Sequence, residues 1–115
     1  MENKQLYWTA TGSKGKLKSF DAVEGFSIDY DKLQCSLFAY ENKKDELFFI
    51  CEVETGISIS RGKELKYAIE YLDEIIEKQG SLRINEKINE YKKGSEKVPS
   101  NPPVELESVL MTNLK

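Results

Sequence analysis

The chain has 115 residues, of which 39% are apolar and 32% are charged, and its formal net charge is −3. This length and composition are typical of one globular domain with a single core, and they exclude a disordered chain. Histidine is absent, which excludes Ser-His-Asp triads and histidine zinc sites, and two cysteines are too few for a disulfide framework.

No run approaches the roughly 18 uncharged apolar residues of a membrane span, and the first five residues lack the layout of a signal peptide. We therefore expect a cytoplasmic protein with no membrane association. The remaining carboxylates, lysines, tyrosines and cysteines show no catalytic spacing. The sequence predicts a protein that is not an enzyme and needs no metal or cofactor.

The first predicted element is a hairpin. Residues 5–11 are rich in aromatic and β-branched side chains, and a turn signal at 12–15 separates them from Leu17 and Phe20. Phe26, Ile28 and Tyr30 then alternate with polar residues, which predicts a strand with one solvated face.

Residues 33–40 and 46–53 are predicted to form an antiparallel hairpin centred on Lys43. This register places Cys35 opposite Cys51, where the two thiols could form a disulfide or a redox switch. Small buried core thiols are the alternative that we favour. All pairs on this face would be apolar: Leu33 with Val53, Cys35 with Cys51, Leu37 with Phe49, and Ala39 with Leu47.

After a turn at Thr55–Gly56, residues 61–79 carry a helical pattern. Ser60 or Gly62 could cap its beginning, and Gly80 could end it in a left-handed conformation. The apolar positions form one stripe that is expected to lie on the sheet: Leu65, Ala68, Ile69, Leu72, Ile75 and Ile76.

Residues 81–84 are predicted as a short strand or turn, after which Asn85 caps a shorter helix that carries Ile88 and Tyr91 and ends at Gly94. Three prolines mark a linker beyond it, and an apolar tail at 104–115 is expected to dock on its own domain or on another chain. The predicted organisation is one domain over residues 1–93, followed by a linker and docking tail over 94–115. The fold class is α+β, with an antiparallel sheet of four to five strands packed on one long helix, a second short helix and an extended C-terminal tail.

Acidic residues concentrate in one part of the chain. Residues 21–60 contain nine Asp or Glu against three Lys. Such a surface could attract a basic partner and exclude acidic competitors, as an inhibitor that places carboxylates where phosphates would sit would do. Solubility alone is an equally good explanation of the net charge.

Two nucleotide-related readings are disfavoured. The segment Gly12-Ser13-Lys14-Gly15-Lys16 has glycines and lysines suited to phosphate, but the Walker spacing fails at Ala10 and Leu17. Lys14, Lys16 and Lys18 beside Tyr7 and Trp8 could hold single-stranded nucleic acid. A pI near 5.1 disfavours that partner.

Residues 48–63, FFICEVETGISISRGK, followed by Ala68-Ile69, form a strand, a Thr-Gly turn and a Gly-Lys that leads into a helix. This pattern resembles small accessory proteins of phages and mobile elements. The resemblance implies a protein that inhibits a host defence or regulatory factor by binding it.

The sequence thus predicts a non-enzymatic binding protein of the inhibitor or immunity type, whose partner is another protein, with homodimerisation as a further possibility. The alternatives are sequestration of a nucleotide-like ligand and binding of single-stranded nucleic acid. An aromatic patch of Tyr7, Trp8, Phe38, Tyr40 and Phe48 is expected on the surface if the tail leaves it uncovered. The candidate partner-binding residues are Tyr7, Trp8, Lys14, Lys16, Asp29, Tyr30, Asp31, Tyr40 and Arg61.

Overall fold

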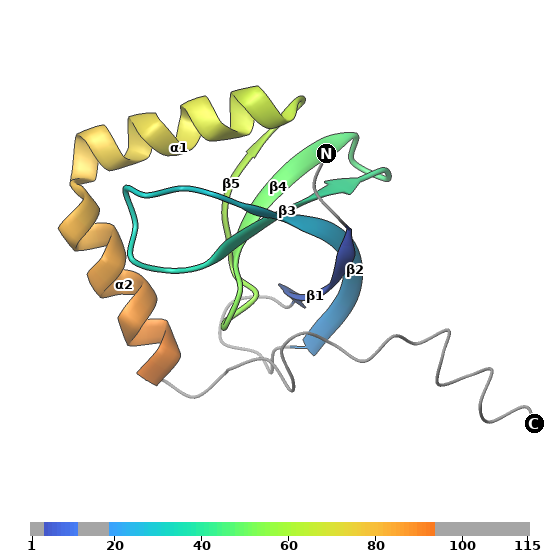
Figure 1. The fold of residues 1–115 in the computed structure, drawn as a ribbon, viewed down its shortest axis with the longest axis horizontal. Coiled ribbons are helices and arrows are strands. Elements are labelled where there is room, and N and C mark those ends of the chain that lie inside the picture. The colour runs from blue at the N-terminus through green and yellow to red at the C-terminus, as the bar shows by residue number, and fades with distance from the viewer. Residues whose placement is uncertain (1–3, 12–18, 94–115) are drawn as a thin grey trace, which may run out of the picture.

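The computed structural model describes residues 4–11 and 19–93, which form an α+β fold (Figure 1). A five-stranded antiparallel sheet has the strand order β1-β2-β3-β4-β5, so each strand pairs with its neighbour in the chain. Two helices follow the sheet. The elements are β1 (Gln5–Thr11), β2 (Ser19–Ile28), β3 (Leu37–Asn42), β4 (Leu47–Glu52), β5 (Ser58–Gly62), α1 (Leu65–Gln79) and α2 (Ser81–Lys93).

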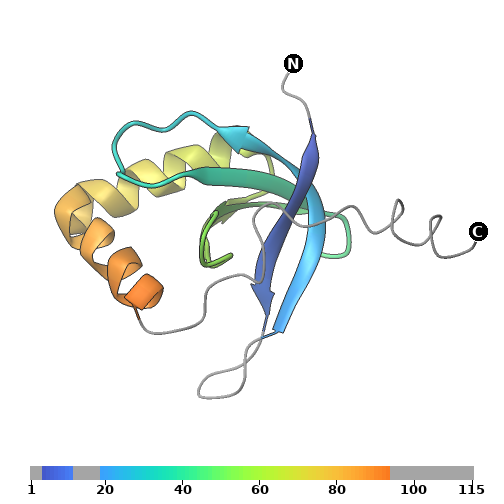
Figure 2. The same ribbon diagram turned by 60° about the horizontal axis from the view of Figure 1, so that its bottom comes forward.

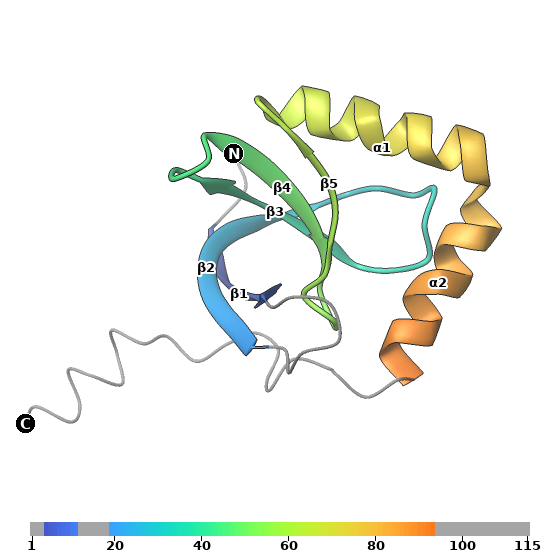
Figure 3. The same cartoon turned by 180° about the vertical axis from the view of Figure 1, so that it is seen from behind.

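The longest strand, β2, is divided between two partners. It pairs with β1 from Ser19 to Gly25 and with β3 from Phe26 to Ile28. A Cβ atom at Gly25 would lie 2.4 Å from the backbone oxygen of Ala39, so only glycine allows the two chains to meet this closely at the change of partner. Figure 3 shows the resulting curvature of β2.

The sheet curls until β1 reaches the turn between β4 and β5. The Ala10 amide donates a hydrogen bond of 2.8 Å to the Gly56 carbonyl oxygen. Gly56 has a φ of 70°, and a Cβ there would lie 2.9 Å from backbone atoms of Trp8 and Ala10. Both the positive φ and the close approach of β1 therefore require glycine at this position. Figure 2 shows β1 lying along β2 and across the sheet.

The curl creates a small second core on the sheet face that the helices do not cover. The Tyr7 and Phe38 rings stack in parallel with 4.2 Å between their centroids, although β1 and β3 are not paired. The buried members of this cluster are Tyr7, Phe38, Tyr40 and Cys51. Tyr7 and Phe38 are only 4% and 0% exposed, so the exposed aromatic patch expected from the sequence does not form around them.

The main core lies between the other face of the sheet and the two helices. Ala68, Leu72 and Ile76 of α1 are buried there, and the remaining members of the predicted stripe pack partly buried around them. The prediction that one apolar face of this helix lies on the sheet is therefore confirmed. Helix α2 contributes Ile84 and Ile88, which are one turn apart.

The predicted register of the second hairpin is wrong by three residues. Phe38, not Cys35, stands opposite Cys51, and Ala39 stands opposite Ile50. The turn explains the difference, because the Asn42 side-chain oxygen accepts hydrogen bonds from the amides of Lys44 and Asp45 and closes a four-residue loop. A shift by an odd number of residues turns the other face of β4 toward the same partners on β3. Both faces of β4 carry apolar side chains, so either register pairs apolar residues.

The cysteines are therefore not a cross-strand pair. Cys35 lies outside β3 and is half-buried, whereas Cys51 is buried in the second core, and neither forms a disulfide. Residues 33–36, predicted as the beginning of a strand, belong to a loop over residues 29–36 that we call the 29–36 loop. Leu33 anchors this loop by burial in the main core.

Both helices begin at residues other than those predicted. The N-cap position of α1 is Glu64, whose side chain makes no capping hydrogen bond, rather than Ser60 or Gly62, because Ser58–Gly62 completes the sheet as β5. The Ser60 hydroxyl instead donates a 2.6 Å hydrogen bond to the carbonyl oxygen of Ala68 and ties β5 to the helix.

Gly80 ends α1 with a positive φ of 88°, as predicted, but its ψ of 141° lies outside the left-handed helical region. Helix α2 follows at once from Ser81, where a strand or turn was predicted. Asn85 is not its cap, because the Asn85 side-chain oxygen accepts a hydrogen bond from the Gln34 amide in the 29–36 loop.

Neither described helix combines the length and apolar character needed to cross a membrane. The predicted Gly12–Gly15 turn, the linker and the docking tail lie outside the described residues.

Candidate binding groove

The division of β2 between two partners leaves an opening in the sheet. From Ser19 to Glu24, β2 is paired on its β1 side only, and from Tyr40 to Asn42, β3 is paired on its β4 side only, as far as the described strands extend. The two edges diverge from the Gly25 corner. A pocket of about 720 Å³ lies between them, and we call it the β2–β3 groove.

The β2–β3 groove combines strand edges, carboxylates and aromatic rings. Asp21 and Glu24 come from β2 and Glu41 comes from β3, and all three are exposed. They are three of the nine acidic residues in the acidic part of the sequence. The other lining residues are Lys4, Thr9, Val23, Phe26, Tyr40, Asn42, Lys43, Phe48 and Leu65.

The Tyr40 side chain lines the groove and lies near two carboxylates. Burial raises the pKa of Tyr40, a hydrogen bond with Thr9 partly offsets the rise, and the carboxylates of Asp45 and Asp21 raise it further. Anionic groups disfavour a second negative charge nearby. Three carboxylates, of Asp21, Glu24 and Glu41, line the groove together with the ammonium groups of Lys4 and Lys43, so acidic groups exceed basic groups there by one.

Thr9, which lines the groove, also lies beside the buried Cys51 thiol of the second core. The Thr9 hydroxyl lies 4.0 Å from the Cys51 sulfur and donates a 3.5 Å hydrogen bond to the Gly56 carbonyl oxygen. Burial raises the pKa of the Cys51 thiol to about 12, so the reactive thiolate is not formed near neutral pH. This polar cluster closes the curl of the sheet.

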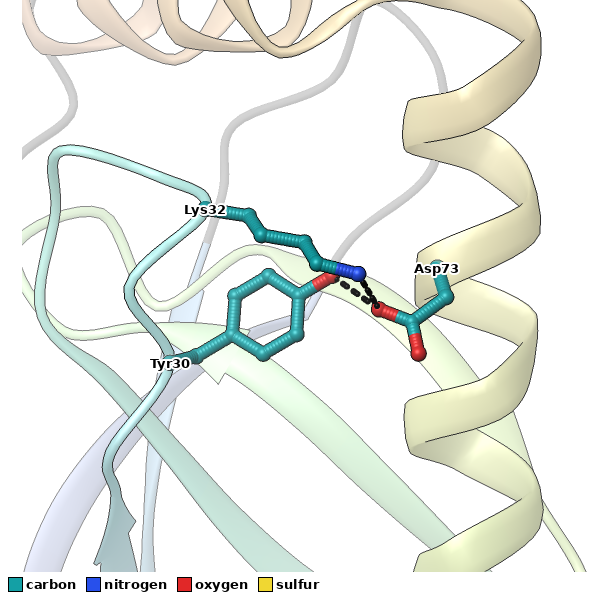
Figure 4. Close-up of polar contacts among 3 residues, drawn as sticks. All are labelled: Tyr30, Lys32 and Asp73. Atoms are coloured by element: carbon teal, nitrogen blue, oxygen red, sulfur yellow. Dashed lines mark hydrogen bonds and ion pairs between the residues drawn. The ribbon is translucent and has the colours of Figure 1, made fainter.

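A second polar constellation joins the 29–36 loop to α1 (Figure 4). The Tyr30 hydroxyl donates a 2.6 Å hydrogen bond to a carboxylate oxygen of Asp73, and the Lys32 ammonium contacts the same oxygen at 3.0 Å. Burial, followed by the bond to Asp73, raises the pKa of Tyr30, whereas the bonds from Tyr30 and Lys32 lower the pKa of Asp73. We call these three residues the loop clasp.

The structure separates the sequence-predicted site residues. Tyr7 and Tyr40 are buried in the second core, although Tyr40 also lines the β2–β3 groove. Trp8 is half-buried on β1. Lys14 and Lys16 lie outside the described residues.

The remaining predicted site residues lie away from the groove. Asp29 and Asp31 are exposed on either side of Tyr30, whose hydroxyl belongs to the loop clasp. Arg61 is exposed on β5, opposite Phe49 of β4. The predicted role of these residues in binding a partner stays a prediction.

Sequence reasoning missed most of the groove. The sequence identifies Asp21, Glu24 and Glu41 only as members of the acidic part at residues 21–60. Gly25 within a strand pattern was the available signal, since an isolated glycine in a strand marks a bend or a close backbone approach.

Among the described residues, no group of three or more Cys, Asp or Glu side chains is arranged to hold a metal ion. Comparison of the chain with models of protein families, with curated proteins and with solved structures finds no significant match.

Proposed function

We propose that this protein is a non-enzymatic binding protein that engages a basic segment of another protein in the β2–β3 groove. The observation that carries the proposal is the pair of diverging strand edges, each with hydrogen-bonding groups directed away from its sheet partner, beside three exposed carboxylates. An extended peptide can pair with such an edge through its backbone. Lysine or arginine side chains of the peptide would then meet the carboxylates.

The chemistry of the groove supports an inhibitor or immunity-type role. A basic protein segment held by Asp21, Glu24 and Glu41 would be withheld from phosphate groups that it otherwise contacts. These three carboxylates outnumber the two lysines of the groove, Lys4 and Lys43, and Arg61 lies apart on β5, which argues against sequestration of a nucleotide. An origin among phage or mobile-element accessory proteins remains part of this proposal.

The aromatic floor of the groove supplies the apolar contact that tight peptide binding needs. Phe26, Tyr40 and Phe48 line it together with Leu65 from the first turn of α1. Aromatic anchors inside a polar rim are the usual arrangement of a protein-binding surface.

The test is affinity capture from a lysate of the source organism or its host with matched variants. The groove variant combines Asp21→Lys with Glu41→Lys and reverses one charge on each wall. The helix variant combines Glu86→Lys on α2 with Glu70→Lys on α1, both at exposed positions, and has the same total charge. The unmodified protein and the helix variant should capture the same basic protein, and the groove variant should bind it at least about tenfold more weakly. Equal capture by the groove variant would contradict the proposal.

A further inference from the structure

Helix α1 carries an exposed aromatic pair beside its buried stripe. Tyr67 and Tyr71 are one turn apart, and they are 45% and 47% exposed. The Lys66 ammonium lies 5.1 Å from the centre of the Tyr67 ring and covers part of one face only. Both rings lie outside the buried stripe of α1, which is formed by Ala68, Leu72 and Ile76.

The residues that share this side of α1 form a stripe with internal symmetry. Ile75, which also packs partly buried against the main core, lies one turn after Tyr71, and Lys78 follows Ile75 by one turn. Glu64, the N-cap residue with extended backbone, precedes Tyr67 by three residues. Tyr67 lies four residues before Tyr71, and Ile75 lies four residues after it. The anionic Glu64 lies seven residues before Tyr71, and the cationic Lys78 lies seven residues after it. We call these five residues the α1 stripe.

We propose that the occupant of the α1 stripe is a second copy of this chain, with the two helices antiparallel and the two-fold axis beside Tyr71. That arrangement places Glu64 opposite Lys78 twice, Tyr67 opposite Ile75 twice, and the two Tyr71 rings next to each other. A parallel arrangement would place like charges together. Charge complementarity therefore selects the second copy and its direction.

The two charged groups are available for this contact. Glu64 and Lys78 are both exposed, and neither forms an ion pair with another residue in the part of the chain that is described, where Lys32 pairs with Asp73. A shallow pocket of about 190 Å³ beside Tyr71 and Ile75, walled by β5 from Ser58 to Arg61, continues the surface onto the sheet edge. The α1 stripe is separate from the β2–β3 groove, so the two proposals stand independently.

The expected dimer is concentration-dependent, because one pair of short helices is a small interface beside the roughly 1,200–2,000 Å² of stable complexes. Sedimentation velocity of the full chain up to about 1 mM should show a rising dimer fraction. Lys78→Glu and Glu64→Lys should each raise the dimer Kd by about tenfold or more, since each places like charges together at two symmetry-related points. The double variant should restore the Kd to within about threefold of the original value.

Glu77→Lys is the matched control, because it makes the same kind of change on α1 outside the stripe and should leave the Kd unchanged. Circular dichroism verifies that each variant is folded. A second test introduces Tyr71→Cys, which should form an intermolecular disulfide on mild oxidation, while Glu77→Cys should not. A chain that stays monomeric throughout the concentration range, or a dimer that ignores the charge reversals, would overturn the inference.

Discussion

Glu52 shows how a charged residue can belong to the core. Its side chain is 1% exposed, and its carboxylate accepts hydrogen bonds from the amides of Glu54 and Thr55 and from the Thr55 hydroxyl. These three bonds shape the turn that presents Gly56 to β1. A buried carboxylate is tolerated when hydrogen bonds from the protein replace those that it loses to water.

Glu52→Gln should therefore lower the free energy of unfolding by about 2 kcal/mol. Both carboxylate oxygens of Glu52 accept hydrogen bonds from backbone amides. A glutamine amide has only one oxygen, and its NH₂ group would face a backbone N–H group, to which it cannot bond. Urea unfolding followed by circular dichroism measures the change. Glu86→Gln, the same substitution at an exposed position of α2, should stay within about 0.5 kcal/mol of the unmodified protein. Equal effects at both positions would contradict the assigned role of Glu52.

The loop clasp makes a pH-dependent contribution to stability. The bonds from Tyr30 and Lys32 lower the pKa of Asp73 in the folded state relative to the unfolded chain. The contribution is therefore complete above the unfolded pKa of about 4 and disappears as the pH falls through the lower folded value. The Asp73 side chain is 39% exposed, so solvent screening keeps the contribution small.

Asp73→Asn should lower the free energy of unfolding by about 1 kcal/mol or less at pH 7, and the difference from the unmodified protein should shrink as the pH falls below about 4. Unfolding in urea at several pH values measures this difference. A destabilisation that does not change between pH 7 and pH 3 would show that the carboxylate charge is not involved.

At the scale of single elements, the Gly25 corner determines the shape of the sheet. Because β2 changes partner there, β1 can curl toward the β4–β5 turn and the β2–β3 groove can open. The space beside Gly25 is occupied by backbone of β3, which cannot move aside as a side chain could.

Gly25→Ala should lower the free energy of unfolding by about 2 kcal/mol or more, because the new methyl group meets the Ala39 oxygen at 2.4 Å. Ser27→Ala, at an exposed position two residues along the same strand, should change it by about 0.5 kcal/mol at most. Thermal unfolding of both variants makes the comparison. A Gly25→Ala protein as stable as the Ser27→Ala protein would contradict the claim that the close approach of β2 and β3 requires glycine at this position.

The elements differ in how far the sequence could predict them. The buried stripe of α1 follows from a 3.6-residue period that local residues determine, so the helix and its packing face were predictable. The register of β3 with β4 depends on the Asn42 side chain and the loop that it closes, and two apolar faces allowed either register. The beginning of α1 was misplaced because a nearby β5 competes for Ser60 and Gly62.

At the scale of the whole molecule, the α+β architecture was predictable and the curl of the sheet was not. The sequence contains Tyr7 and Phe38 as aromatic strand residues, but their stacking requires β1 to cross a strand with which it shares no ladder. The β2–β3 groove has the same origin, since its walls come from residues about 20 positions apart whose edges fail to pair. Its acidic character alone was foreseeable.

The most direct test of the groove is a titration of the ¹⁵N-labelled full chain with a synthetic ten-residue peptide of alternating lysine and valine, followed by amide NMR. The account predicts saturable shift changes at residues 19–24 and 40–42, which weaken when Asp21→Lys and Glu41→Lys are combined. A peptide of alternating glutamate and valine should leave these amides unchanged. Absence of saturable changes at these two edges, or equal changes with both peptides, would contradict the claim that this groove binds basic segments.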